Sequence, residues 1–317
     1  MRSKTNSAVR RAGLVLITLL AWSTSYADHT VEENVVYGMY SGLALLMDVY
    51  RPETPNGFGL VVIPGSGWEA PLNFSAQQLK ESYELQAVFG IESIVNAGYT
   101  AFVINHRATP RFKYPAPIED AQRAVRFIRH HADTYGIDPA RIGAIGGSSG
   151  GHLASLLGTL DGDGIENDSD PINQQSAKVQ AVVAVYPAVD FLSFETSNPW
   201  AGGAITSLLG PVNPAWKPPP LQNPSDFEIY RQASPTHHVS ADDSPFLLIH
   251  GDADSVVPFG QSELMKKELD AVGIEAVLIT VPGGDHGPGL VQNDDYGHVD
   301  EIVQWLDMHV LRPNVIN

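Results

Sequence analysis

Two adjacent serines, Ser148 and Ser149, lie in a segment that reads Gly-Gly-Ser-Ser-Gly-Gly, and either of them could act as a nucleophile. A serine exposed on a sharp strand-to-helix turn needs small residues two positions away on each side, because larger side chains would collide there. Each of the two serines has glycine at both of these positions. The spacing therefore predicts a nucleophilic serine of the G-x-S-x-G type, but it does not choose between Ser148 and Ser149.

The downstream sequence offers an acid and a base that could serve this serine. Asp252 and Asp254 directly follow the strand-like run 246–250, so either carboxylate could orient an imidazole. His286 lies in the glycine-rich segment Pro282-Gly-Gly-Asp-His-Gly287, after the next strand-like run. Serine, then acid, then histidine is the chain order found in α/β-hydrolases. The three features together predict a Ser-His-Asp triad.

The segment Pro64-Gly-Ser-Gly-Trp68 follows an early strand-like run and is a candidate oxyanion loop. Backbone N–H groups in a loop of small residues can point at the negative charge that develops on a carbonyl oxygen. The expected donors are the amides of Ser66 and Gly67, with that of Ser149 if Ser148 is the nucleophile. Trp68 is expected to contact the substrate.

The elements that must position these residues alternate between strand and helix. Apolar and β-branched runs predict strands at 34–41, 43–50, 59–63, 100–105, 141–145, 179–186, 246–250 and 275–281. Helical spacing predicts helices at 84–96, 116–135, 149–160, 262–272 and 298–310. The first two strands read as an antiparallel pair. The later alternation predicts an α/β fold, with a mostly parallel central sheet covered by helices on both faces.

Residues 198–235 interrupt the alternation between two late strands. This segment contains several prolines together with Trp200, Trp216 and Tyr230, and it is too long for a plain connection. It is interpreted as a cap over the site, the alternative being a surface excursion that never touches substrate. No internal repeat or second domain is visible, so residues 28–317 are expected to form one domain with this cap-like insertion.

Three motifs give the chain a resemblance to a known family. They read Gly-Ser-Ser-Gly-Gly-His-Leu-Ala at 147–154, His-Gly-Asp-Ala-Asp-Ser-Val-Val-Pro at 250–258, and Asp-His-Gly at 285–287. From about Val61 to the last helix, the chain resembles the esterase/lipase branch of the α/β-hydrolases. This branch includes hormone-sensitive-lipase-like enzymes and bifunctional feruloyl and acetylxylan esterases. The resemblance implies Ser148 as nucleophile, Asp254 rather than Asp252 as acid, and His286 as base.

The chain departs from the family pattern in its candidate oxyanion loop. The family usually has H-G-G-G-W or a close variant there, whereas this chain has Pro64 in place of the histidine and Ser66 in place of the middle glycine. Backbone donors survive both changes, because neither Ser66 nor Gly67 is proline. Ser149 stands where the family usually has alanine, and it is small enough to fit.

Other polar residues are weaker candidates for the triad. Asp190 follows the strand at 179–186, a position that some hydrolases use for the acid. His298 and His309, in the last predicted helix, are alternative bases but are expected to be surface or packing residues. His152, in the helix after the nucleophile, is expected to pack or to form hydrogen bonds.

The sequence predicts no cofactor and no metal site. The acidic loop 161–170 resembles a calcium loop, but it departs from the D-x-[DN]-x-[DN]-G spacing at Ile165, so a solvated surface is favoured. The pair His237-His238 has no further metal ligand at a recognisable spacing.

The first 27 residues have the order of a secretory signal peptide. Four basic residues precede the apolar run 13–22, and Ser25-Tyr26-Ala27 offers a cleavage site with small residues. The run is too short for a stable bilayer anchor, although a retained anchor is the alternative. The protein is therefore expected to be secreted or periplasmic after removal of residues 1–27.

Composition excludes several classes of partner. The 317 residues are 43% hydrophobic, which suits a globular protein with a large core. Without residues 1–27 the chain keeps 15 basic and 36 acidic residues, a formal charge of −21. Such a surface repels nucleic acid and anionic membranes, so neither nucleic-acid binding nor stable membrane association is expected. There is no cysteine, hence no disulfide or thiol nucleophile. The oligomeric state is left open.

These features and the resemblance imply a secreted serine carboxylic-ester hydrolase that works through an acyl-enzyme. The resemblance makes deacetylation or deferuloylation of plant polysaccharide one expected activity, with simple acyl esters and polyesters as further substrate classes. One alternative is an exported serine peptidase or amidase on the same fold. Another is a non-catalytic binding protein built on a hydrolase scaffold.

Overall fold

The computed structural model describes residues 29–40, 42–69, 82–210, 224–290 and 298–310. The predicted signal peptide lies outside the described residues, as does Trp216 of the predicted cap. Among the residues that are described, no helix combines the length and the apolar character needed to cross a bilayer.

Eight strands form one sheet in the order β1-β2-β4-β3-β5-β6-β7-β8. Their bounds are β1 His29–Tyr40, β2 Leu43–Pro52, β3 Gly59–Ile63, β4 Thr100–Ile104, β5 Ile142–Gly147, β6 Val182–Val185, β7 Phe246–Gly251 and β8 Ala276–Val281. β2 pairs antiparallel with β1 and with β4, and every pairing from β4 to β8 is parallel. The mostly parallel α/β architecture predicted from the sequence is confirmed.

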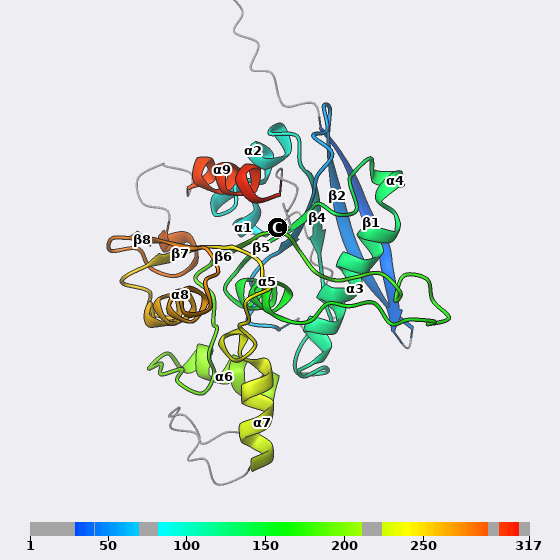
Figure 1. Cartoon of the computed structure of the whole chain (residues 1–317). Coiled ribbons are helices and arrows are strands. Elements are labelled where there is room, and N and C mark those ends of the chain that lie inside the picture. Colours follow the sequence, from blue (N-terminus) through cyan, green and yellow to red (C-terminus); the bar gives the residue numbers. More distant parts are fainter. Residues whose placement is uncertain (1–28, 41, 70–81, 211–223, 291–297, 311–317) are drawn as a thin grey trace, which may run out of the picture.

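Helices cover both faces of this sheet (Figure 1). One core cluster packs α3 (Ala116–His130), α5 (Ser149–Thr159) and α8 (Gly260–Val272) against one face. A second cluster packs α1 (Tyr83–Ala87), α2 (Ile91–Asn96) and α9 (Val299–His309) against the other. Every residue of β3, β4, β5, β6 and β7 is buried, because strands covered on both faces have no solvent side.

Two predicted helices are each divided in the structure. The segment 84–96 forms α1 and α2, separated at Gly90, whose φ of 60° lies in the left-handed region. A Cβ at Gly90 would also lie 2.4 Å from a methyl group of Val299, so the chain bends where glycine lets it approach α9. The segment 116–135 forms α3 and the short α4 (Ala132–Tyr135), because His131 leaves the helical region with ψ near 19°.

The predicted insertion lies between β6 and β7. Its described part contains α6 (Pro199–Leu209), α7 (Pro224–Ala233) and the 3-10 turn Pro235–His237. The side chain of Asn198 begins α6 by accepting the backbone N–H groups of Trp200 and Ala201. The N-cap residue Asn198 thus defines where helix α6 begins.

Candidate active site

The loops that follow five strands carry the candidate residues. Parallel strands end at a common edge of the sheet, and ligand sites of open α/β sheets gather beyond that edge. Ser66 follows β3, Ser148 follows β5, and Tyr186 follows β6. Asp254 follows β7, and His286 follows β8. Residues spread over more than 200 positions are thereby brought to one place.

Ser148 occupies a strained turn between β5 and α5. Its φ is 52°, a left-handed value that is costly for a residue with a side chain. A Cβ at Gly146 would lie 2.2 Å from the carbonyl oxygen of Gly150, and one at Gly150 would lie 1.9 Å from that of Ile63. Backbone atoms cannot yield as side chains can, so the turn around Ser148 requires glycine on both sides.

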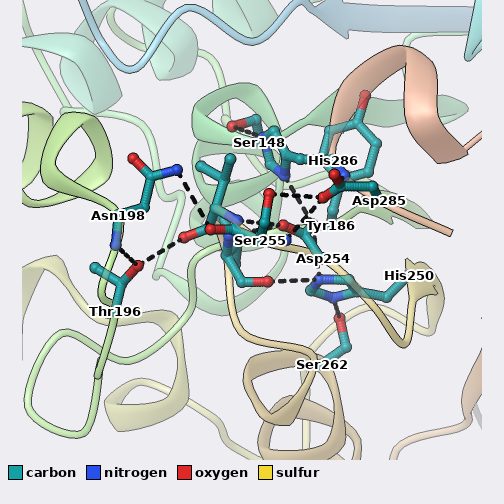
Figure 2. A network of polar contacts seen from close by, with 12 residues as sticks. Ser148, Tyr186, Thr196, Asn198, His250, Asp254, Ser255, Ser262, Asp285 and His286 are labelled. Atoms are coloured by element: carbon teal, nitrogen blue, oxygen red, sulfur yellow. Dashed lines mark hydrogen bonds and ion pairs between the residues drawn. The ribbon is translucent and has the colours of Figure 1, made fainter. Parts of the chain in front are cut away.

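His286 links Ser148 to Asp254 (Figure 2). Its Nε2 lies 2.9 Å from Ser148 Oγ, and its Nδ1 lies 2.7 Å from Asp254 Oδ2. The structure therefore brings together the serine, acid and histidine that the sequence singled out. With the Nδ1 proton donated to the carboxylate, Nε2 is free to accept the serine proton.

The side chain of Asp254 is buried and surrounded by donors. Beyond His286, it accepts the backbone N–H groups of Val256 and Val257, each at 2.8 Å, and it lies 3.2 Å from Nε2 of His250. Burial disfavours the charged form, but the hydrogen bonds from His250 and His286 outweigh this and hold the pKa of Asp254 well below its usual range. The group is a carboxylate at neutral pH.

His250 extends this chain of hydrogen bonds into the core. Its Nδ1 lies 2.7 Å from the hydroxyl of Ser262 in α8, and its Nε2 lies 3.1 Å from the carbonyl oxygen of Val257. The ring is fully buried. Asp254 therefore lies between two histidines, His286 on the side of Ser148 and His250 on the side of the core (Figure 2).

Two further aspartates connect the loop after β7, which carries Asp254 and is called the acid loop below, with the loop after β8, which carries His286. Asp252, the alternative acid, accepts the backbone N–H of Gly283 at 2.6 Å and does not contact His286 through any described bond. Asp285 accepts the backbone N–H and the hydroxyl of Ser255. Asp252 thus supports the turn that carries His286, whereas Asp254 touches its ring.

The loop after β3 differs from expectation at Ser66. Its backbone N–H donates to Ser149 Oγ at 2.8 Å, so this amide is already satisfied and is not presented to a substrate oxygen in this state. Gly67 and Ser149 both border a small cavity beside Ser148. Among the described hydrogen bonds, none uses the backbone N–H of either residue. Those two amides are the remaining candidates for binding an oxyanion.

Trp68 also helps to hold the candidate oxyanion loop in place. Its ring is only 4% exposed, and its Nε1–H donates to His152 Nδ1 at 3.0 Å. Nε2 of His152 in turn lies 2.7 Å from the carbonyl oxygen of Ala233, at the end of α7. Trp68 borders the cavity, and its indole fastens the candidate oxyanion loop to α5. His152 forms hydrogen bonds, as expected.

Two residues that sequence reasoning missed also lie here. The carboxyl group of Glu84 accepts the backbone N–H of Gly65 and the hydroxyl of Tyr186, the latter at 2.9 Å. The ring of Tyr186 packs against His286 with centroids 4.5 Å apart. Helical spacing places Glu84 at the start of a helix but gives no signal that its side chain is buried.

The weaker candidates lie apart from this group of residues. Asp190 accepts the backbone N–H of Leu192 and the hydroxyl of Ser193, and it lies 3.5 Å from His237. His298 faces Glu301, and His309 packs on Trp305. In the acidic loop, Asp170 pairs with Arg123 at 2.7 Å. Within the described ranges, no group of three or more His, Asp or Glu side chains could hold a metal ion.

The cavity beside Ser148 is narrow and mainly apolar, with a volume of about 20 Å³. That is room for a group of about the size of a water molecule or a methyl group. Its lining comes from the loop after β3, the turn at Ser148, the segment after β6, helix α6 and the loop after β7. It includes Phe194, Trp200, Ile205 and Val256. Trp200 is 49% exposed, so it forms part of the rim. The insertion therefore reaches the site through α6.

A comparison with known protein families shows to which family this chain belongs. The family described as BD-FAE matches residues 47–269, which include Ser148 and Asp254. The chain belongs to the BD-FAE family. This places it in the esterase branch of the α/β-hydrolases, as the sequence motifs implied.

Individual proteins similar to this chain are described as esterases or as ester hydrolases. Esterase LipC of Mycobacterium tuberculosis is 29% identical over 267 residues, covering 82% of this chain and 60% of LipC. A truncated carbohydrate esterase from gut microbiota superposes with a TM-score of 0.71 at 29% identity, covering 89% of this chain and 97% of that one. An acetyl ester-xyloside bifunctional hydrolase from Caldicellulosiruptor lactoaceticus gives 0.67 at 27% identity, covering 87% and 93%. The chain spans 55% to 62% of the length of three curated Mycobacterium tuberculosis relatives.

Proposed function

We propose that this protein is a serine carboxylic-ester hydrolase in which Ser148 is the nucleophile, His286 the general base and Asp254 the orienting acid. The observation that carries the proposal is the position of His286, whose two ring nitrogens lie 2.9 Å from Ser148 Oγ and 2.7 Å from Asp254 Oδ2. Membership of the BD-FAE family and the similarity to proteins named as esterases support the same reaction class.

The first half of the reaction forms an acyl-enzyme. His286 Nε2 takes the proton of Ser148 while Oγ attacks the ester carbonyl carbon. Asp254 holds the ring in the tautomer that leaves Nε2 unprotonated, and it stabilises the imidazolium that forms. The buried carboxylate is preorganised for this by Val256 and Val257, which leave it little freedom to turn.

The backbone N–H groups of Gly67 and Ser149 are proposed as the oxyanion donors. Both residues border the cavity beside Ser148, and both amides lack another described partner. Ser149 is also the first residue of α5, where N–H groups point outward and the helix dipole favours negative charge. Collapse of the tetrahedral intermediate releases the alcohol, which receives its proton from His286.

Water completes the cycle by attacking the acyl group on Ser148. His286 now removes a proton from water and later returns it to Ser148 Oγ. The products are a carboxylic acid and the free enzyme. No step in this sequence calls on a metal ion or a cofactor.

A short acyl group on a carbohydrate is the substrate that we favour. The narrow apolar cavity beside Ser148 suits an acetyl methyl group better than a long chain. Proteins similar to this chain are described as an acetylxylan esterase, in Xylanibacter ruminicola, and as carbohydrate esterases. Rates on acetyl-xylan, methyl ferulate and nitrophenyl esters of graded chain length test this choice, and highest kcat/KM on long-chain esters would refute it.

The reaction class is tested by Ser148→Ala with nitrophenyl acetate as substrate. Turnover is expected to fall by about 10⁵–10⁶, because the nucleophile is lost while the fold is kept. Aminoacyl nitroanilides serve as the second substrate class, since a peptidase or amidase would prefer them. A Ser148→Ala protein that keeps its esterase activity would end the proposal.

Export is proposed from the N-terminal sequence alone. Residues 1–27 combine a basic start, an apolar run and a small-residue cleavage site, which fits secretion or a periplasmic location without stable membrane association. N-terminal sequencing of the protein recovered outside the cytoplasm should begin at Asp28. Recovery of the intact N-terminus in the membrane fraction would instead indicate an anchor.

A further inference from the structure

The carboxyl group of Glu84 is buried at the junction of two parts of the site. It accepts the backbone N–H of Gly65, in the loop that leads to the proposed oxyanion donor Gly67. It also accepts the hydroxyl of Tyr186, whose ring packs against His286. One side chain thereby contacts both the loop after β3 and the residue that supports the base.

Close packing leaves this carboxyl group little freedom. A Cβ at Gly65 would lie 2.9 Å from Glu84 Oε1, and a Cβ at Gly147 would lie 2.8 Å from the same atom. Gly147 directly precedes Ser148 at the end of β5. Glu84 therefore fills the space between the loop after β3 and the turn that carries the nucleophile. A displacement of Glu84 would change the packing of both segments.

We propose that Glu84 is a positioning residue for the reaction at Ser148. It fixes the oxyanion loop through Gly65, holds the ring of Tyr186 against His286, and favours the protonated form of His286 through its own negative charge. The inference rests on the proposed function, since it assigns Glu84 a task in that reaction. Glu84 is not placed in contact with the reacting atoms.

The groups around Glu84 explain why a carboxylate is needed there. A buried carboxylate is costly unless donors or positive charge compensate it. The donors are Gly65 and Tyr186, and the charged group that faces it is His286 when protonated. In the part of the chain that the structure describes, no Lys or Arg forms an ion pair with Glu84. Burial raises the pKa of Glu84, and the hydrogen bonds from Gly65 and Tyr186 oppose that rise.

Because His286 becomes positively charged during the reaction, a second carboxylate nearby favours that form. The ring of His286 faces Asp254 through Nδ1 and Tyr186 through its face, with Asp285 adjacent in sequence. Removal of the charge on Glu84 leaves the hydrogen bond between His286 and Asp254 intact. The expected consequence is a base that loses its proton at lower pH and stabilises the transition state less well.

The test compares Glu84→Gln with Glu92→Gln, in which the same change is made on an exposed residue of the next helix, α2. With nitrophenyl acetate, Glu84→Gln should lower kcat by about 10- to 100-fold, less than the loss of a whole oxyanion donor, while KM changes by less than about threefold. The acid limb of its pH–rate profile should move to lower pH by about half a unit or more. Glu92→Gln should leave kcat, KM and the profile unchanged.

Tyr186→Phe provides a second variant that keeps the charge of Glu84 but removes one of its donors. Its kcat should fall severalfold, with KM and the acid limb unchanged. This variant decides the question alone if Glu84→Gln does not fold, since an unaltered kcat in Tyr186→Phe would then overturn the proposal.

Two outcomes refute the role of Glu84. One is a Glu84→Gln protein with kcat within about twofold of the parent, and the other is a lower kcat with an unshifted acid limb, which would indicate a purely structural role. Ser148→Ala separates this failure from that of the proposed function. If Ser148→Ala is inactive while Glu84→Gln is normal, only the inference about Glu84 fails.

Discussion

The hydroxyl of Ser149 accepts the backbone N–H of Ser66 at 2.8 Å, whereas the hydroxyl of the neighbouring Ser148 lies 2.9 Å from His286 Nε2. Two serines with the same glycine spacing are thus held in different ways. Ser148 faces the proposed base, and Ser149 fastens the loop after β3 to the first turn of α5. The side chain of Ser149 therefore has a supporting task, separate from the oxyanion role proposed for its backbone N–H.

This difference predicts a mild phenotype for Ser149→Ala. The variant keeps the backbone N–H of residue 149 and loses only the acceptor for Ser66, so kcat/KM should stay within about tenfold of the parent. Loss of this partly buried hydrogen bond should lower the free energy of unfolding by about 0.5–1.5 kcal/mol. Steady-state kinetics and urea unfolding measure the two effects. A loss of about 10⁴ or more in kcat would instead make Ser149 the nucleophile.

Asp254→Asn and Asp252→Asn test which of the two aspartates orients His286, a choice that sequence spacing did not make. The amide that Asp254→Asn introduces would no longer hold His286 in the productive tautomer, so kcat should fall by about 10³–10⁴. Among the described contacts, the carboxylate of Asp252 accepts the backbone N–H of Gly283, away from the ring of His286, so Asp252→Asn should keep kcat within about tenfold. Both proteins are assayed on nitrophenyl acetate at pH 7. The reverse order of effects would contradict the assignment of Asp254.

The buried ring of His152 predicts acid sensitivity of the fold. Burial lowers the pKa of His152 to about 4, because the buried ring would lose solvation on protonation. The unfolded chain has a histidine pKa of about 6.5, so it binds the extra proton first as the pH falls. Stability is complete above pH 6.5 and should decline by about 1.4 kcal/mol per pH unit down to about pH 4.

Variants at two histidines test this pH dependence. His152→Gln should be less stable at pH 7 but should show a flatter decline between pH 6.5 and 4, as followed by urea unfolding. His130→Gln, which changes an exposed histidine of α3, should retain the slope of the parent. Parallel curves for the parent and His152→Gln would show that His152 does not cause the decline.

Asn198 links the insertion to the acid loop. Its Oδ1 caps α6, and its Nδ2 donates to the carbonyl oxygen of Ser255 at 3.3 Å (Figure 2). Asn198→Ala should lower the free energy of unfolding by about 1 kcal/mol through loss of the cap and should raise KM, because α6 borders the cavity. Asn198→Asp keeps the cap acceptor but loses the donor, so it should recover stability and still raise KM. An unchanged KM in both variants would argue against a role for this link.

Much of the site could be predicted because its key residues follow strands. Glycine spacing marks the turn at Ser148, and the strand-like runs before Asp254 and His286 place both side chains at the same edge of the sheet. The predicted mostly parallel sheet is therefore sufficient to bring the three together. The resemblance to the family was needed to choose Ser148 over Ser149 and Asp254 over Asp252, since spacing alone fits both members of each pair.

The remaining contacts depend on how loops pass one another, which local patterns do not encode. The partner of the Ser66 amide is a side chain more than 80 positions away, so its occupation could not be foreseen. The residue type of Trp68 suggests a substrate contact. Its type does not reveal that the indole N–H donates a hydrogen bond to His152, 84 positions away. Glu84 is buried through contacts with Gly65 and Tyr186, which lie 19 and 102 positions away, so its local sequence does not reveal its burial.

The central claim is that Ser148 is the nucleophile, and covalent labelling tests it most directly. The protein is treated with a fluorophosphonate, digested, and the modified residue is located by tandem mass spectrometry, with Ser148→Ala and Ser149→Ala treated in parallel. One phosphonyl group per chain is expected on Ser148, together with complete loss of esterase activity. The label should persist in Ser149→Ala and disappear in Ser148→Ala. A label on Ser149, or an unlabelled protein that remains fully active on esters, would contradict the account.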